Sequence, residues 1–397
     1  MTRTAILSLI AMAAPARVLT PEALERSQSV MRAMYTLDYD RAEELSKRMI
    51  AEAPDDPAGY ANLARTYWNE QLAGERLLTI DRFAASGFFS ESPRYRVKID
   101  PAAEKRFREA CEEAIARGKK RLDQNPNDLA ARYWLGVAYQ NLGSYDFSLR
   151  RRWWSSFQHG EKTLRLHREI LRREPDFADA LLAIGVSNYV AAVVPWQVKW
   201  LTTLLGYRGS RERGKQELED VARRGVLARD DARTVLCLLY TRDKQHDKVL
   251  QKLAELLERY PENYFAHLEM GGVAMRLNRM GRAIEIYQEI LARIEAGQHR
   301  YGRLERAVVY NRLGAAQREQ GSLEAAADWF RKVLDTGTAS PRSQAVARLE
   351  LGKTLDLMGR RQEALQEYRA VTLAEDFAGS RHEAEELRSR RYQRRRD

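Results

Sequence analysis

Arginine and tryptophan are concentrated at one place in the sequence, Arg150-Arg151-Arg152-Trp153-Trp154. A guanidinium group binds phosphate or carboxylate in bidentate fashion, and tryptophan is enriched where a membrane meets water. The segment is therefore a candidate contact for an anion or a lipid surface. The alternative is a helix whose Trp side chains pack inside the protein while its Arg side chains face water.

A second candidate is residues 190–207, which contain Trp196 and Trp200 and a single charged residue, Lys199. We expect this apolar segment to form a helical hairpin buried against the rest of the protein. The alternative places it at a membrane surface. No segment after the N-terminal region reaches the about 18 uncharged apolar residues of a transmembrane helix, so no membrane span is predicted.

Residues 209–215 match the GxxxxGK pattern of phosphate-binding loops, but Gln216 stands where Ser or Thr would hold magnesium. The pattern also requires a preceding strand, whereas the segment before it is apolar, helix-like and contains Lys199. A glycine turn that begins a helix explains these residues better, and we expect no nucleotide there.

The other candidate ligands and nucleophiles are scattered along the chain. Cys111 and Cys237 make no CxxC metal site, and both are expected to be buried packing residues. None of the six histidines belongs to an HExxH motif or a Cys/His ligand pair, and His267 is expected to pack in an aromatic position. The sequence therefore predicts no metal, no cofactor and no enzyme activity.

Helices must position these residues, because Ala, Leu, Arg and Glu dominate the composition and strand-like alternating runs are nearly absent. The formal net charge is +11 and the pI is about 9.6. A basic surface favours anionic partners. The basic residues are interspersed with many Glu residues, so we expect a solvated, salt-bridged helical surface rather than one basic patch.

One pattern of large and small residues recurs along the chain. It follows W-x2-L-G-x2-Y and then A-x3-F, with a period of about 34 residues. Cys237 and Gly271 are 34 residues apart, Gly271 and Gly314 are 43 apart, and Gly314 and Gly352 are 38 apart. Seven or eight units follow the pattern, through Ala42; Tyr60, Leu63, Ala64 and Tyr67; Leu135, Gly136 and Tyr139; Leu181, Ile184 and Gly185; Leu236, Cys237, Tyr240 and Leu253; Met270, Gly271, Ala283 and Tyr287; Tyr310, Leu313, Gly314, Ala326 and Phe330; and Leu351, Gly352, Ala364 and Tyr368.

These units resemble the tetratricopeptide repeat. The resemblance implies an all-α fold, a right-handed superhelical solenoid of helix pairs over residues 17–378. Three irregular insertions interrupt the period, near residues 73–100, 145–160 and 190–209. Insertions in such repeats map to loops on one face, often the binding face.

A longer stretch, residues 180–290, is similar to the eukaryotic family of tetratricopeptide repeat proteins that includes a yeast outer-mitochondrial-membrane protein for inclusion-body clearance. The residues that carry the similarity are Asn188-Tyr189, Val194-Pro195, residues 204–211, Gly214, Leu218 and residues 236–240. This resemblance implies a superhelical adaptor working beside a membrane or lipid, without catalytic residues.

The two ends of the chain have their own signatures. Residues 1–16 resemble a secretory signal peptide, with Arg3, an apolar run and the small residues Ala14 and Ala16. We therefore expect export to the periplasm and a mature start close to Arg17; the alternative is the first core helix of a cytoplasmic protein. Residues 379–397 form an Arg-rich tail, expected to be a helix that frays into disorder.

The first helix of each pair is expected to line a concave groove that binds a peptide. The residues predicted to point into it, exposed to solvent, are Asn62, Arg65, Asn69, Tyr133, Gln140, Asn311, Arg318 and Lys353. Their basic groups favour an acidic or C-terminal segment of a protein partner. The alternative is that these side chains are solvated and bind no partner.

The chain is thus predicted to be a protein-interaction scaffold of the bacterial cell envelope. The alternative is a peripheral lipid-binding protein that uses residues 150–154 and 190–207. Nucleic-acid binding through the Arg-rich tail is the least favoured function.

Overall fold

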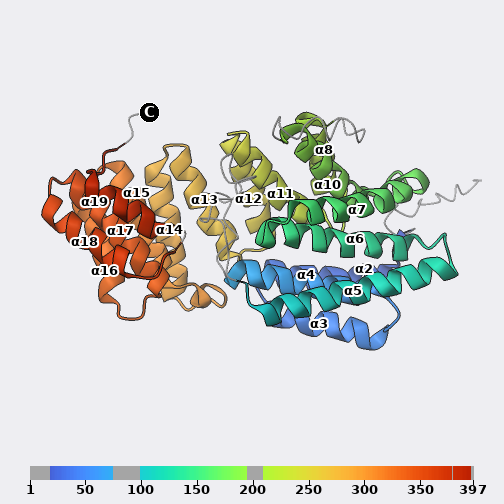
Figure 1. Cartoon of the computed structure of the whole chain (residues 1–397). Coiled ribbons are helices and arrows are strands. Elements are labelled where there is room, and N and C mark those ends of the chain that lie inside the picture. Colours follow the sequence, from blue (N-terminus) through green and yellow to red (C-terminus); the bar gives the residue numbers. More distant parts are fainter. Residues whose placement is uncertain (1–17, 75–98, 195–208, 378, 395–397) are drawn as a thin grey trace, which may run out of the picture. The chain divides into compact units, whose positions relative to one another are not determined.

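The computed structural model describes residues 18–74, 99–194, 209–377 and 379–394, and every regular element in these ranges is a helix. The chain divides into two compact units, one up to Leu236 and one from Cys237 onward. Consecutive helices pack against one another in pairs, as Figure 1 shows along each unit. The predicted all-α fold of helix pairs is confirmed.

The first unit contains four helix pairs in its described residues. They are α2 (Pro21–Tyr35) with α3 (Tyr39–Glu52), α4 (Pro57–Gly74) with α5 (Pro101–Gln124), α6 (Leu129–Tyr145) with α7 (Trp153–Arg173), and α8 (Leu181–Val193) with α10 (Arg211–Arg224). A π-helical turn, η3 (Asp146–Arg150), continues α6, and a 3-10 turn, η4 (Ala178–Ala180), precedes α8. The boundary between the units falls within α11 (Arg229–Arg242).

The second unit continues with α12 (His246–Arg259), α13 (Tyr264–Arg276), α14 (Met280–Glu295), η5 (Tyr301–Arg303), α15 (Arg306–Gln320), α16 (Leu323–Asp335), α17 (Pro341–Leu357), α18 (Arg361–Leu373) and α19 (Ser380–Ser389). The first helices of successive pairs lie side by side, because α15 contacts α17 and α17 contacts α19. These three helices form one layer of the unit.

Polar capping residues set where many helices begin. A side-chain oxygen of the residue before each of these helices accepts a backbone N–H from its first turn, which stabilises a helix by about 0.5–2 kcal/mol. Proline adds to the start of three of them, at Pro21, Pro101 and Pro341. The capping residues are Thr20, Asp38, Asp100, Asp128, Ser210, Asn263 and Ser340.

Glycine on the first helix of a pair lets an aromatic ring of the second helix pack against its backbone. A Cβ atom added at Gly271 would lie 2.3 Å from the Tyr287 ring, and one at Gly314 would lie 2.6 Å from the Phe330 ring. The same relation joins Gly352 to Tyr368, at 2.5 Å. The small and large residues of the repeat pattern therefore meet across each of these helix pairs.

Two further glycines explain the GxxxxGK pattern. The α10 helix begins at Arg211 after the Ser210 cap, as predicted from the glycine turn. A Cβ atom at Gly214 would lie 2.6 Å from the carbonyl oxygen of Gly185, and one at Gly209 would lie 2.3 Å from the backbone nitrogen of Ala192. Gly214 thus allows α10 to pack closely against α8, and Gly209 allows the segment before α10 to do the same.

The structure differs from the predicted insertion at residues 145–160. The segment is helical except at Arg151 and Arg152, and a left-handed conformation of Arg151, at φ 56°, turns the chain from η3 into α7. Most of the other two predicted insertions, and the predicted signal peptide, lie outside the described residues. No helix in the described ranges is long and apolar enough to cross a membrane.

Candidate interaction face

Charged side chains gather where α15, α17 and α19 lie side by side. Arg318 on α15 pairs with Glu350 on α17. Lys353 Nζ lies 2.7 Å from Glu350 Oε1 and 2.7 Å from Glu383 Oε1 on α19. We call this layer, with the acidic residue Asp356 that follows on α17, the C-terminal face.

The ion pairs shift the pKa values of their members in the stabilising direction. Burial would raise the pKa of Glu350, but Arg318 and Lys353 outweigh it and lower that pKa to about 2. Burial would lower the pKa of Arg318 and of Lys353, yet the neighbouring Glu350 raises both. All three groups are therefore charged at neutral pH and satisfied within the protein.

Asp356 is the most buried acidic residue of the C-terminal face, with no exposed surface. Its carboxylate accepts hydrogen bonds from the Arg361 guanidinium at 2.9 Å and from the Tyr368 hydroxyl at 2.9 Å. A third donor is the backbone N–H of Tyr392, 2.9 Å from Asp356 Oδ2. That third donor belongs to the segment after α19.

Residues 390–394, which we call the tail segment, lie against the C-terminal face. Arg390 has an extended backbone. Arg391 Nε donates to the carbonyl oxygen of Asp356 at 2.9 Å, and an Arg394 guanidinium nitrogen donates to the carbonyl oxygen of Arg318 at 3.0 Å. The prediction of a tail that frays beyond its helix is wrong for these residues, because hydrogen bonds hold them.

The Tyr392 ring lies near two cations of the face. The Arg318 guanidinium carbon is 5.6 Å from the ring centre and Lys353 Nζ is 5.8 Å from it. Cations at this distance from an aromatic ring are attracted to it. The C-terminal face thus binds an extended segment both through its backbone and through an aromatic side chain.

In the first unit, the predicted groove residues are also engaged. Arg65 NH1 lies 3.1 Å from Asp231 Oδ2, and the Tyr35 hydroxyl donates to Asp231 Oδ1 at 2.8 Å. The Asn62 amide donates to Ser27 Oγ at 3.3 Å. Tyr133 stacks on His167, with ring centres 5.6 Å apart.

Exposure was therefore predicted incorrectly for most of the groove residues. Arg65 is only 5% exposed and Arg318 only 7%. The repeat period gives the helix face on which a residue lies, but it does not reveal which helix or segment covers that face. The other buried residues of the set are Asn62, Tyr133, Asn311 and Lys353, while Asn69 and Gln140 are half-buried.

No direct signal in the sequence marked the acidic partners. Asp231 and Asp356 are ordinary acidic residues in helices, and neither belongs to a motif. The available signal was the spacing of Glu350, Lys353 and Asp356, three residues apart and hence on one side of α17.

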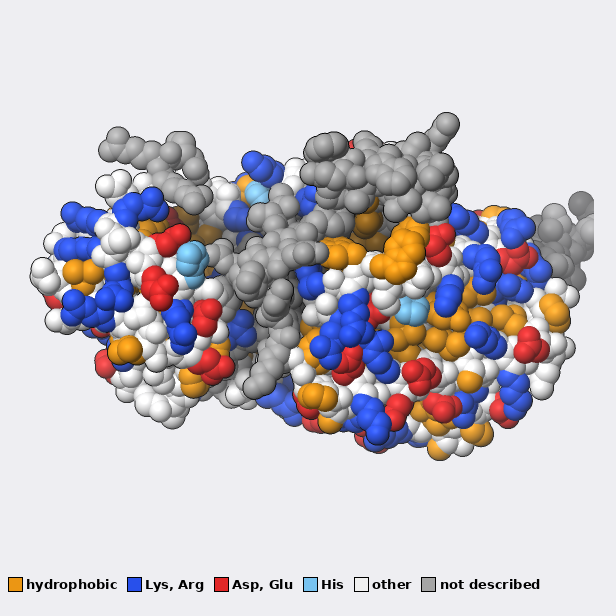
Figure 2. Space-filling model, in the orientation of Figure 1, with side chains coloured by type: hydrophobic (Ala, Val, Ile, Leu, Met, Phe, Trp, Pro, Cys, Tyr) orange, Lys and Arg blue, Asp and Glu red, His pale blue; other side chains and the backbone are white. Residues whose placement is uncertain are grey.

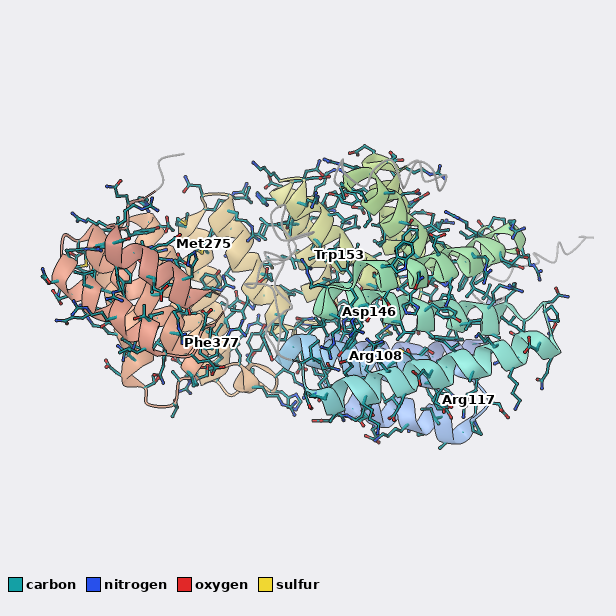
Figure 3. The ribbon with its side chains drawn as sticks, in the orientation of Figure 1. Arg108, Arg117, Asp146, Trp153, Met275 and Phe377 are labelled. Atoms are coloured by element: carbon teal, nitrogen blue, oxygen red, sulfur yellow. The ribbon has the colours of Figure 1, made fainter. Side chains whose placement is uncertain are left out.

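The Arg/Trp segment lies at the turn between α6 and α7. Figure 3 shows Arg108 of α5 close to Asp146, where Arg108 NH2 donates to Asp146 Oδ1 at 2.8 Å. Arg150 pairs with Glu104, and the Arg151 guanidinium lies 5.0 Å from the Trp153 ring centre.

One part of the segment fits the packing interpretation, and the other part fits the interpretation as a surface contact. Arg150, Arg151 and the half-buried Trp153 are engaged within the protein. Arg152 is exposed, and Trp154 is 63% exposed and stacks on Phe157, with ring centres 5.7 Å apart. Trp196 and Trp200 lie outside the described residues.

Ser155 and His159 lie beside the Asp146 carboxylate. The Ser155 hydroxyl donates to Asp146 Oδ2 at 2.5 Å. His159 Nε2 is 3.9 Å from the same carboxylate oxygen. Among the described side chains, no group of three or more His, Cys, Asp or Glu residues is arranged to hold a metal.

The predicted packing residues lie where expected. Cys111 and Cys237 are buried and unpaired as thiols, and burial raises the pKa of each. His267 is buried, with Nδ1 2.9 Å from the Tyr301 hydroxyl. Figure 2 shows Lys and Arg side chains interspersed with Asp and Glu on the visible face, as the sequence predicted.

Comparison with known proteins identifies the repeats. Residues 263–339 match the family model of the tetratricopeptide repeat, which covers α13 to α16. No curated protein matches the sequence. The similarity of residues 180–290 to the inclusion-body-clearance family stays a prediction.

Several solved structures are similar to the chain. A thermophilic tetratricopeptide repeat protein of Thermus thermophilus has a TM-score of 0.34 and 19% identity, over 64% of this chain and 99% of that chain. Yeast Tom70 has a TM-score of 0.39 and 10% identity, over 93% and 89%. The human IFIT1 dimer with m7Gppp-AAAA has a TM-score of 0.43 and 14% identity, over 94% and 88%.

Proposed function

We propose that this tetratricopeptide repeat protein is a non-enzymatic scaffold of the bacterial cell envelope that binds an extended segment of a protein partner. Repeat folds of this kind present long surfaces suited to protein binding. We place the binding site on the C-terminal face, formed by α15, α17 and α19.

One observation carries this proposal. The buried Asp356 carboxylate accepts a backbone N–H of an extended segment, while carbonyl oxygens of Arg318 and Asp356 accept guanidinium groups from the same segment. Recognition of backbone groups together with selected side chains is how extended peptides are bound. The face therefore has the chemistry of a peptide-binding site.

Export to the envelope rests on the sequence alone. Arg3 and the apolar run before Ala14 and Ala16 have the order of a signal peptide. An envelope location makes a periplasmic or membrane-bound protein the partner.

Site-specific crosslinking tests the proposed face. A photo-crosslinking amino acid at Gln320, an exposed residue next to the Glu319 carbonyl that receives Arg394, is introduced into the full chain in its native organism. The matched control is Gln366, an exposed residue of α18. We expect capture of one protein from Gln320 alone, with the crosslinks mapping by mass spectrometry to one short segment of it. Equal capture from both positions, or capture from neither even when residues 390–397 are removed, would reject the face.

A second candidate function is contact with a lipid surface through the start of α7. The observation in its favour is the 63% exposure of Trp154, beside the exposed Arg152. An indole next to a cation suits the boundary of an anionic membrane.

A further inference from the structure

The C-terminal face is already occupied, and its occupant belongs to the same chain. The tail segment donates one backbone N–H to Asp356 and places the Tyr392 ring within 6 Å of both Arg318 and Lys353. Arg391 and Arg394 reach carbonyl oxygens of α17 and α15 on either side. The contacts thus follow the order cation, aromatic ring, spacer and cation along residues 391–394.

We propose that the tail segment is an intramolecular ligand that blocks the C-terminal face, and that the partner's segment presents the same order of groups. This inference rests on the proposed function, because it names the chemistry of the partner at that site.

The tail segment is attached to the surface rather than built into the core. Arg391, Gln393 and Arg394 are exposed, and Tyr392 is half-buried. The preceding helix α19 is anchored separately, through the buried Ala384 and Leu387. Arg361 also donates to the carbonyl oxygens of Leu387 and Arg388, each at 2.9 Å. The tail segment can therefore leave the face while α19 stays in place.

The charges of the face favour a basic occupant. Glu350 and Glu383 already neutralise Arg318 and Lys353. The groups that meet the tail segment are instead the Asp356 carboxylate, the Glu319 carboxylate and backbone carbonyl oxygens. Arg318 and Lys353 already have anionic partners. The partner segment is therefore basic and aromatic, not acidic as the sequence predicted.

A tethered ligand competes strongly with a free one. A segment joined by a short linker acts at an effective concentration on the order of millimolar. A free partner must therefore bind the open face much more tightly than the tail does, or the tail must first be released.

A peptide-binding experiment tests the proposal. The probe is a fluorescein-labelled synthetic peptide of residues 387–397, and its anisotropy is measured with the full chain, with a chain ending at Ser389, and with Tyr392→Ala and Tyr392→Phe in the full chain. We expect the chain ending at Ser389 to bind the probe at least about ten-fold more tightly than the full chain does. Tyr392→Ala should also bind more tightly than wild type, by up to about ten-fold, because the ring's contact with two cations is lost.

Matched controls identify the recognised groups. Tyr392→Phe retains the ring and should behave as wild type, and a probe with Ala in place of the tyrosine should bind the open chain about ten-fold less tightly. Equal binding of the probe by all four proteins, or no binding by the open chain, would overturn the proposal. Circular dichroism checks that each variant is folded. If the shortened chain does not fold, the full-length Tyr392→Ala variant still provides the test.

Hydrogen exchange gives an independent measurement. The Tyr392 amide should exchange slowly in the wild type because it donates to Asp356, and exchange at the rate of a free chain would also overturn the proposal. The probe-binding and exchange tests could fail while crosslinking at Gln320 still captures one protein. That result would remove the blocking role and leave the scaffold function standing. Probe binding by the open chain without any captured protein would support the blocking role and remove the proposed scaffold function.

Discussion

The Arg65 guanidinium of α4 lies 3.1 Å from the Asp231 carboxylate of α11, and Tyr35 of α2 donates to the same carboxylate. Burial raises the pKa of Asp231, an effect that Arg65 opposes. The ion pair joins α4 to α11, and the Tyr35 hydrogen bond adds α2; Arg65 is buried and Asp231 is half-buried.

Removing Arg65 should therefore destabilise the first unit strongly. Arg65→Ala leaves Asp231 without its cation, and breaking a buried pair costs about 3–5 kcal/mol. The combined Arg65→Ala and Asp231→Ala change should cost less than the sum of the single changes. Urea unfolding measures these free energies. Arg48→Ala, at an exposed pair with Glu52, is the control and should change stability by less than about 0.5 kcal/mol.

Two neighbouring glycines provide a test of the repeat packing. A Cβ atom at Gly271 would meet the Tyr287 ring at 2.3 Å, whereas one at Gly272 would meet nothing closer than 3.9 Å. Gly271→Ala should lower the free energy of unfolding by about 1–3 kcal/mol through overpacking. Gly272→Ala should raise it by about 0.5–1 kcal/mol, because alanine favours the helix. Thermal unfolding of the two variants gives the comparison, and equal melting temperatures would contradict the packing.

Stability of the second unit should depend on the ionisation of Glu350. Its pKa is lowered from 4.5 to about 2, so its contribution is complete above pH 4.5 and is lost as the pH falls toward 2. Full protonation should cost on the order of 3 kcal/mol. Urea unfolding of wild type and Glu350→Gln between pH 6 and pH 2 measures this term, and the two proteins should converge in stability as the pH falls. A constant difference between them would show that Glu350 is not held as a charged group.

The second candidate function makes its own prediction at Trp154. If the start of α7 contacts lipid, the full chain floats with vesicles containing anionic phospholipid, and Trp154→Ala floats several-fold less. The melting temperature should stay unchanged, because the side chain is 63% exposed. Phe147→Ala does not serve as a second test of the lipid contact, because the Phe147 ring packs on Trp153 inside the turn. Equal flotation of wild type and Trp154→Ala would remove this candidate.

Export can be tested without any variant. Mass spectrometry of the protein from its native organism should find a mature N-terminus close to Arg17, in the periplasmic fraction. A chain that retains Met1 in the cytoplasmic fraction would contradict export.

The sequence predicted local relations better than distant ones. The pairing of Gly314 with Phe330 follows from a fixed spacing within one helix pair, and helix starts such as the one after Ser210 follow from capping chemistry. The partner of Arg65 could not be predicted in this way, because Asp231 belongs to a distant helix and no spacing connects them. The position of Tyr392 depends on how the chain folds back after α19, which no repeat period specifies.

Close contact between α8 and α10 also limits how this stretch of sequence can drift. Gly185 and Gly214 face one another so closely that each Cβ atom would meet the backbone of the opposite helix, at 3.0 and 2.6 Å. Substitution at either position requires the two helices to separate, so selection for stability alone can preserve both glycines.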